Sequence, residues 1–169
     1  MAEFIDQSYL LPSTPAALLE ALRDPEVVAR RAAGSHVLSH SVGDGDSDPH
    51  PTVEIEARTD IPLSWLPPLI QSRLPEPASV TRTERWQQAD ESHLTAEQSF
   101  RFTGVPARCT GRSEVHAEGS GSRLTVQLSL TVDLPLVSGL VERAVAPQIV
   151  RSLDEEAAFY AGLGEEPGS

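Results

Sequence analysis

Two predicted strands that follow one another in the sequence carry residues that could form a polar ligand site. Because side chains alternate between the two faces of a strand, every second residue shares a face. In the strand 78–88, one face carries Val80, Arg82, Glu84 and Trp86. In the strand 93–102, one face carries Leu94, Ala96, Gln98, Phe100 and Phe102. If the apolar members of the second set point into the core, Gln98 does so too.

The hairpin between these strands is predicted to turn at about Asp90. This register sets Arg82 opposite Gln98 and also sets Glu84 opposite Ala96. Buried charges destabilise a protein unless they are paired or hydrated. An inward group of Arg82, Glu84 and Gln98 therefore predicts a wet cavity in which these side chains orient the polar end of a ligand.

Two further interpretations of the same residues stay open. In the first, the opposite face of the strand points inward, with Thr81, Thr83 and Arg85, or the polar group lies at the rim of the sheet. In the second, the chain is an enzyme of cyclase or hydrolase type that uses Glu84 or Arg82. That function requires a carboxylate with a perturbed pKa that is directed into the pocket.

Small residues follow one another on a third strand, 107–117. Gly111 shares a face with Cys109, Ser113 and Val115. A glycine inside a strand predicts a bend, or the close approach of a helix or a ligand, and we favour the bend. The single cysteine can form no internal disulfide, and no activating base is identifiable near it, so Cys109 is predicted to be a small buried residue.

The loop after residue 43 carries alternating aspartates, Asp44, Asp46 and Asp48, as a calcium loop does at its start. The sixth position of that pattern is Pro49, where glycine is needed for the turn. The twelfth is Ile55, where a bidentate glutamate is needed. We therefore interpret this segment as a solvated hairpin tip.

The five histidines are dispersed in the sequence. His36 and His40 are separated by about four rises of ~3.3 Å, too far apart to bind one metal ion easily. His93 and His116 are predicted to face outward. Gly119-Ser120-Gly121 is a turn without the strand-to-helix context of a nucleophilic serine. We expect no metal, no cofactor and no catalytic residue.

Charge and composition exclude other classes of partner. The net charge is −12, from 25 acidic residues against 13 basic residues, all of them arginine. An acidic chain repels the phosphate backbone, so nucleic acid is not an expected partner. The start, Met1 to Asp6, carries acids where a secretory signal carries bases. No run approaches the ~20 apolar residues of a membrane span, and we expect a cytoplasmic location. The oligomeric state stays undetermined.

The elements that position these residues follow from periodicity and from turn residues. A first strand, 3–11, precedes a helix that is capped by Ser13 or Thr14. A second helix begins at Asp24-Pro25, runs to Ala33 and closes at Gly34. The remaining predicted strands are 35–42, 52–59, 78–88, 93–102, 107–117 and 123–133. The proline-rich segment Pro62–Pro77 is predicted to be a partly helical lid or loop.

The segment 136–163 is predicted to be helical, with a disordered tail at 164–169. Apolar residues of its first part define one face at about 100° per residue: Leu136, Val137, Leu140, Val141, Ala144 and Val145. Beyond Pro147 the apolar residues cluster on nearly the opposite face. Because proline removes a helical hydrogen bond, we predict a kink or break near Pro147. Glu142 and Arg143 lie off the first face and are interpreted as solvated; closure of the pocket mouth by one of them is the alternative.

Short motifs along the chain resemble those of a known superfamily. They are Tyr9, Asp24-Pro25, Glu84-Arg85-Trp86, Gly104-Val105-Pro106, Gly111, and the run Leu134 to Glu142. With the order strand, two helices, six strands and a long helix, the chain resembles the START-like superfamily of polyketide cyclases and lipid-transfer proteins. More narrowly, it resembles an uncharacterised bacterial domain-of-unknown-function family within that superfamily. The resemblance implies an α+β helix-grip domain over 1–163, with an antiparallel seven-stranded sheet wrapped around the C-terminal helix.

The resemblance also implies that an apolar ligand is held between the sheet and the long helix. We therefore expect a small hydrophobic or amphipathic molecule as partner. The residues predicted to bind it are Arg82, Glu84, Trp86, Gln98, Phe100, Phe102, Gly111 and Val141. The alternatives are the enzyme described above and a protein-interaction module that uses the segment Trp65–Leu74, which would require an exposed apolar patch there.

Overall fold

The computed structural model describes residues 2–43, 51–72 and 78–163. The strands are β1 (Glu3–Leu11), β2 (His36–Gly43), β3 (Thr52–Ile61), β4 (Ala78–Asp90), β5 (His93–Thr103), β6 (Ala107–Glu118) and β7 (Gly121–Val132). The helices are α1 (Pro15–Arg23), α2 (Pro25–Arg31), the 3-10 helix η1 (Leu63–Trp65), α3 (Pro68–Gln71) and α4 (Ser138–Leu163). The aspartate-rich loop 44–50 and the predicted disordered tail 164–169 lie outside the described residues.

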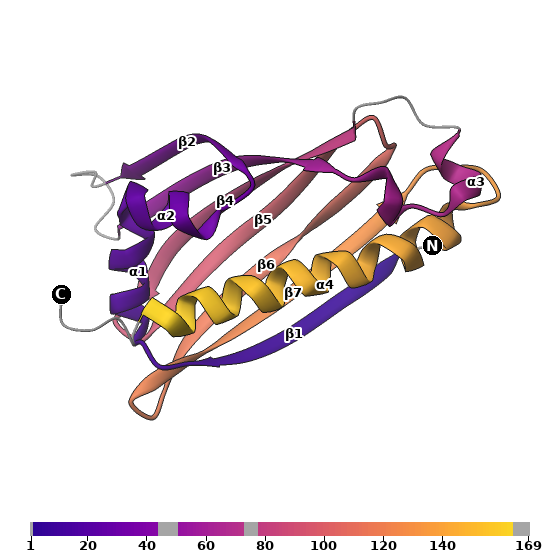
Figure 1. Ribbon diagram of the computed structural model, residues 1–169. Coiled ribbons are helices and arrows are strands. Elements are labelled where there is room, and N and C mark those ends of the chain that lie inside the picture. The colour runs from indigo at the N-terminus through magenta and orange to yellow at the C-terminus, as the bar shows by residue number, and fades with distance from the viewer. Residues whose placement is uncertain (1, 44–50, 73–77, 164–169) are drawn as a thin grey trace.

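The strands form one seven-stranded antiparallel sheet in the order β1-β7-β6-β5-β4-β3-β2. Figure 1 shows α4 lying along one face of this sheet. Helices α1 and α2 lie near the C-terminal end of α4, and α3 lies near the N-terminal end of α4. The architecture is an α+β helix-grip fold, as the sequence predicts. The face of the sheet that is turned toward α4 is called the inner face below.

The two short helices begin at residues that the sequence analysis singled out. Thr14 is the N-cap of α1, and its hydroxyl accepts a hydrogen bond from the backbone N–H of Ala17 at 3.2 Å. Asp24 caps α2 through its carboxylate, which accepts from the N–H of Glu26 at 2.9 Å. A proline follows each cap and supplies a preset helical φ. Gly34 then adopts φ +88°, a left-handed conformation that turns the chain into β2.

The inner face of β7 packs on α4, and this contact forms the centre of the core. Alternate residues of β7 are buried, as the period of two predicts: Leu124, Val126, Leu128, Leu130 and Val132. All but the last belong to one apolar cluster with Leu153 and Ala146 of α4. At roughly 25 cal/mol per Å² of apolar surface, such burial is the main stabilising contribution to the fold.

The predicted break near Pro147 does not occur, because α4 is continuous from Ser138 to Leu163 with Pro147 inside it. The buried residues of the helix are Val141, Glu142, Ala146, Leu153, Ala157 and Tyr160. All except Val141 lie within about 60° of one another at 100° per residue, so one stripe faces the sheet along the helix. Both predicted apolar faces are nevertheless buried, because Val141 of the first face packs in a separate cluster with Leu66 and Ile70 of the segment after β3. Leu136, which was assigned to that face, is fully exposed.

No helix in the three described ranges has both the length and the apolar character that crossing a membrane requires.

The predicted register of the β4–β5 hairpin was also wrong, by two residues. The observed pairs are Arg82 with Phe100, Glu84 with Gln98 and Trp86 with Ala96. The chain turns after Asp90, which pairs with His93, and not at Asp90 itself. The Asp90 carboxylate accepts hydrogen bonds from the backbone N–H of Ser92 at 2.8 Å and from its hydroxyl at 2.9 Å. An aspartate that bonds the backbone two residues on initiates a turn, which explains the later position.

Candidate functional site

A network of charged and polar side chains is buried between α2, the inner face of the sheet and the C-terminal half of α4. Arg31, the last residue of α2, is at its centre. Its Nη1 donates to Glu84 Oε1 at 2.9 Å and to the Tyr160 hydroxyl at 2.7 Å, while its Nη2 donates to Glu84 Oε2. The side chains of Arg31 and Glu84 are 4% and 1% exposed. This is a buried bidentate pair of the strong, charge-assisted kind.

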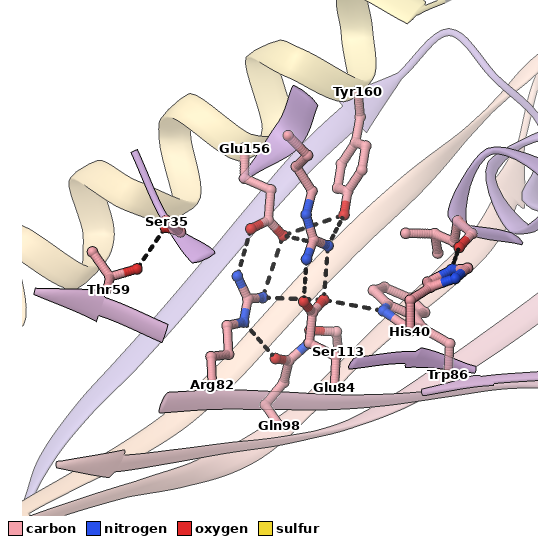
Figure 2. A network of polar contacts seen from close by, with 12 residues as sticks. Ser35, His40, Thr59, Arg82, Glu84, Trp86, Gln98, Ser113, Glu156 and Tyr160 are labelled. Atoms are coloured by element: carbon pink, nitrogen blue, oxygen red, sulfur yellow. Dashed lines mark hydrogen bonds and ion pairs between the residues drawn. The ribbon is translucent and has the colours of Figure 1, made fainter. Parts of the chain in front are cut away.

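A second arm of the network begins at Arg82, two residues before Glu84 on β4 (Figure 2). Both Nη atoms of Arg82 donate to the Glu156 carboxylate on α4, one of them to Oε1 at 3.3 Å. Its Nε donates to Gln98 Oε1 at 3.0 Å, and Gln98 in turn donates to the Ser113 hydroxyl at 3.2 Å. Arg82 Nη2 also lies 3.5 Å from Glu84 Oε1. The arm therefore connects β4, β5 and β6 to the helix.

The network balances its charges and satisfies its acceptors. Arg31 and Arg82 supply two positive charges, and Glu84 and Glu156 supply two negative charges. Tyr160 accepts from Arg31 and donates to Glu156 Oε1 at 3.4 Å. A buried ion that is left unpaired is strongly destabilising, and here each ion has a partner of opposite charge, which makes the buried position possible.

Electrostatics fix the protonation state of Glu84. Burial alone would raise the pKa of this carboxyl. The positive charges of Arg31 and Arg82 outweigh burial, and hydrogen bonds from Arg31 and from the Trp86 indole add to their effect. The pKa of Glu84 is held at about 2. Glu84 is therefore ionised throughout the physiological range.

The other titratable members of the network are fixed in the same way. Burial raises the pKa of the Tyr160 hydroxyl far above its usual range, so this residue stays neutral. Burial disfavours the charged guanidinium of Arg31 and of Arg82, but the carboxylates around them raise both pKa values. Glu84, Tyr160, Arg31 and Arg82 therefore do not gain or lose a proton near neutral pH.

Arg82, Glu84 and Gln98 point inward, which is one of the two orientations that the sequence left open, and the register that places them differs from the predicted one. Arg82 reaches Gln98 as a diagonal neighbour and not as a directly opposite one. The sequence analysis missed Arg31, Glu156 and Tyr160. The last two are four residues apart on α4 and lie beside Ala157, which is on the stripe that faces the sheet. The signal available in the sequence was the spacing of a charged and an aromatic residue four positions apart, which places them on one side of the helix beside the apolar stripe.

A hollow of about 470 Å³ opens beside this network, between the loop after α2, strands β3 to β5, and α4. Arg31, Arg82 and Glu156 line it together with Gln148 and Arg151 from the next turns of the helix. A second, smaller hollow of about 50 Å³ is lined almost entirely by apolar side chains. The two hollows share the residues Ile61, Trp65, Val80 and Phe100. They are therefore adjacent along the helix, one polar and one apolar.

The predicted ligand-binding residues divide into three groups in the structure. Arg82, Phe100, Phe102 and Val141 line one or both of these hollows. The Arg82 guanidinium lies 5.3 Å from the centroid of the Phe100 ring, at the boundary between polar and apolar lining. Glu84, Trp86 and Gln98 are buried behind the lining, where they hold the arginines in place. Gly111 lines neither hollow of the inner face.

The structure explains Gly111 by the packing of neighbouring strands. A Cβ at this position would lie 1.9 Å from the carbonyl oxygen of Gln127 and 2.8 Å from Cα of Leu128, both on β7. The close approach is thus to a strand and not to a helix or ligand. Cys109, on the same face, is buried as predicted, and burial raises the pKa of its thiol to about 12.

Glu142 is not solvated, contrary to the favoured interpretation. Its side chain is buried, and its Oε2 accepts a hydrogen bond from the backbone N–H of Val132 at 2.9 Å. Val132 is the last residue of β7, where a free N–H would otherwise be buried. Glu142 therefore joins the end of β7 to the start of α4, and Arg143 beside it is exposed.

The segment that was predicted as a lid packs against the N-terminal part of α4. Leu66 and Ile70 are buried in a small apolar cluster with Val132 and Val141. Leu69 is exposed, and Leu74 lies outside the described residues. The described part of Trp65–Leu74 therefore closes one end of the apolar hollow and does not present a continuous apolar patch.

Comparisons with known sequences identify relatives of this chain. The profile of a family described as "Protein of unknown function (DUF2505)" matches residues 7–162. An uncharacterized protein of Mycobacterium tuberculosis, Rv0481c, is 27% identical over 117 residues, which are 68% of this chain and 67% of that protein. An uncharacterized protein of Mycobacterium bovis, Mb0491c, matches to the same extent.

Solved structures show the same fold at low sequence identity. A START superfamily protein from Mycobacterium smegmatis has a TM-score of 0.55 at 13% identity, covering 96% of this chain and 97% of that one. TTHA0849 of Thermus thermophilus has a TM-score of 0.55 at 15% identity, covering 95% and 99%. The di-domain ARO/CYC protein StfQ of the steffimycin biosynthetic pathway has a TM-score of 0.57 at 8% identity, covering 98% of this chain and 52% of that one. The fold is therefore START-like.

Proposed function

We propose that this chain, which belongs to the DUF2505 family of proteins of unknown function, binds a small amphipathic molecule between its sheet and α4. The observation that carries the proposal is the adjacency of the polar and the apolar hollow, which share Ile61, Trp65, Val80 and Phe100. A molecule with one polar and one apolar end matches that gradient. The larger hollow, at about 470 Å³, falls in the range of about 300–1,000 Å³ that is usual for small-molecule sites.

The polar end favours a ligand that carries negative charge or hydrogen-bond acceptors. Its charged lining residues are three arginines and two glutamates: Arg31, Arg82, Arg151, Glu155 and Glu156. This lining has a formal charge of +1, in a chain whose total is −12. Arg31 and Arg82 already pair with Glu84 and Glu156, so the exposed Arg151 is the cation best placed to meet an anionic group.

The apolar end favours a compact hydrophobic group over a long chain. Its free volume is about 50 Å³, because side chains from β4 to β7, η1 and α4 occupy most of the space there. Aromatic side chains contribute to its wall on two sides, with Trp65 from η1 and Phe100 and Phe102 from β5. Aromatic and aliphatic walls of this kind bind a ring or a short branched group through apolar burial.

We infer binding rather than turnover. A general acid or base requires a pKa near the operating pH. Glu84, the carboxylate that the enzyme hypothesis assigns, has a pKa of about 2 and already accepts hydrogen bonds from Arg31 and Trp86. The likeness to the ARO/CYC protein carries no residue role at 8% identity. The acidic balance and the single cysteine also support a small-molecule partner in the cytoplasm over nucleic acid or an extracellular role.

Fluorescence of 1-anilinonaphthalene-8-sulfonate, an anionic amphipathic probe, tests the binding site directly. Val80→Trp places an indole where the two hollows meet, and we expect it to abolish saturable enhancement of probe fluorescence. Thr103→Trp is the matched control, because Thr103 is an exposed residue of the neighbouring strand that lines neither hollow. Equal probe binding by wild type and Val80→Trp would refute the proposed site.

Charge reversal at the mouth tests the preference for an anionic group. Arg151→Glu is expected to weaken binding of the same probe at least about fivefold, because the exposed cation near the polar end is replaced by an anion. Arg143→Glu makes the same change on an exposed position of the same helix that lines neither hollow, and binding should stay within about twofold. An equal loss of probe binding in Arg151→Glu and Arg143→Glu would show that only the overall charge matters.

Native mass spectrometry of the purified wild-type protein then reveals the mass of any molecule retained from the cell.

A further inference from the structure

Two histidines and a glutamate meet on the outer face of the sheet, the face turned away from α4. His93 on β5 and His116 on β6 are directly paired across the two strands. Glu114 lies two residues before His116 and therefore shares its face. The neighbours Leu94 and Val115 point inward and are fully buried, which directs the three polar side chains outward. The sequence analysis treated these histidines as dispersed because they are far apart in the chain.

The three side chains are close enough to bind one ion. The imidazole rings are stacked, with centroids 3.9 Å apart and planes inclined by 17°. One ligand atom from each residue can be chosen so that all three lie within 4.8 Å of one another. Zinc with bonds of about 2.0–2.2 Å holds tetrahedral ligand atoms about 3.4 Å apart. Each imidazole nitrogen binds a metal ion in the plane of its own ring, so at least one ring must rotate out of the stack for both to contact one ion.

A second, independent observation points to a ligand at this position. The Nε2 atom of His93 is buried from solvent and has no hydrogen-bond partner among the residues that the structure describes. It lies 3.5 Å from Oε1 of Glu114, near the carboxylate but without hydrogen-bond geometry. A buried polar atom without a partner destabilises the protein, and such atoms call for an explanation. A metal ion between His93 Nε2 and Glu114 would satisfy both groups.

The surrounding charges favour a cation and also moderate its affinity. The Asp90 carboxylate lies close enough to His93 and His116 to interact electrostatically with both rings. Arg112 donates to Glu114 Oε1 at 3.2 Å and competes with a metal for that oxygen. Two imidazoles and a carboxylate suit zinc, copper and nickel, whereas magnesium and calcium require oxygen ligands.

The geometry points to a divalent transition-metal site formed by His93, Glu114 and His116, separate from the hollow beside α4. None of these three residues lines either hollow of the inner face. The two sites can therefore be tested separately.

Calorimetric titration of the metal-free, untagged protein with zinc chloride tests this site. We expect one zinc ion per chain, and we expect the same titration with magnesium chloride to give no heat of binding. In an NMR titration, the side-chain resonances of His93 and His116 should shift together, and those of His36 should not.

Variants distinguish this site from nonspecific binding to acidic surface groups. His116→Gln is expected to weaken zinc binding at least about tenfold, since even groups behind a metal ligand affect affinity by 10–100-fold. His36→Gln, an exposed histidine of β2, is the matched control and should leave the affinity unchanged. Arg112→Gln should strengthen binding, because it frees the Glu114 carboxylate. The proposal is overturned if zinc does not bind at concentrations up to about 1 mM. It is also overturned if His116→Gln and wild type bind zinc with equal affinity. Binding of the fluorescent probe should be unaffected in all three variants.

Discussion

Replacing Glu84 by glutamine tests whether the buried network stabilises the fold as a set of paired ions. Glu84 accepts from both Nη atoms of Arg31 and from the Trp86 indole at 3.1 Å, and its side chain is 1% exposed. Glutamine keeps the shape but removes the negative charge and presents an N–H₂ group to donors. One net positive charge then stays buried between Arg31 and Arg82. Removing one partner of a buried ion pair destabilises proteins by about 3–5 kcal/mol.

The pKa of Glu84 provides a second measure of the same quantity. It lies at about 2 in the folded protein, against 4.5 for an unperturbed glutamate. Each pKa unit corresponds to about 1.4 kcal/mol, so ionised Glu84 contributes on the order of 3 kcal/mol at neutral pH. Because the folded pKa is depressed, this stability is present above pH 4.5 and is lost as the pH falls toward 2. The difference between wild type and Glu84→Gln should therefore shrink to less than half by pH 3.

Urea unfolding followed by tryptophan fluorescence at pH 7 and pH 3 measures both effects. Glu54→Gln is the matched control, because Glu54 pairs with Arg85 at 3.4 Å on the exposed side of β3 and β4. Exposed pairs contribute at most about 1 kcal/mol, so this control should stay close to wild type at both pH values. If Glu84→Gln loses less than about 1 kcal/mol at pH 7, or if its loss of stability is the same at pH 3, Glu84 does not stabilise the fold as a buried ion.

Three further substitutions or treatments test other parts of the structure. Gly111→Ala should lower the free energy of unfolding by about 1–3 kcal/mol, because the added Cβ would lie 1.9 Å from a β7 carbonyl oxygen. The control is Gly162→Ala in α4, where no described atom lies within 4 Å of the added Cβ. This substitution should raise the free energy of unfolding by up to about 1 kcal/mol. Tyr160→Phe should cost about 1–2 kcal/mol in the same urea assay, because it leaves a donor of Arg31 without its acceptor. Cys109, with a pKa of about 12 from burial, should react with a thiol reagent at pH 8 only after unfolding.

Specific outcomes would contradict these expectations. If Gly111→Ala and Gly162→Ala had equal effects, the close approach of β7 would not be what requires glycine. A Tyr160→Phe variant as stable as wild type would mean that Arg31 replaces the hydroxyl with another acceptor. Labelling of Cys109 at the rate of a free thiol in the native protein would show that the inner face opens readily.

Local signals in the sequence were sufficient for most elements and for the buried face of β7. The alternation in β7 predicted its buried residues, because the period of two is a property of the backbone itself. The caps at Thr14 and Asp24 were readable for the same reason, since a cap is made within three residues. Alternation along β5 indicated that Gln98 points toward the helix, whereas in β4 it left open which face, the one with Arg82 and Glu84 or the one with Thr81 and Thr83, is the inner one. Each of these features depends on neighbours in the sequence.

Contacts between distant segments were decided only by the tertiary structure. Arg31 joins the network from α2, and Glu156 and Tyr160 join it from α4, 125 and 129 residues later. The periodicity of apolar residues did not identify these three residues because they are polar. The β4–β5 register depended on a side-chain bond at Asp90 that moved the turn. His93 and His116 became neighbours only through strand pairing. The physical reason is common to all of these: a charge or an imidazole is stable at a buried or crowded position only when its partner is present, and the fold determines which partner arrives there.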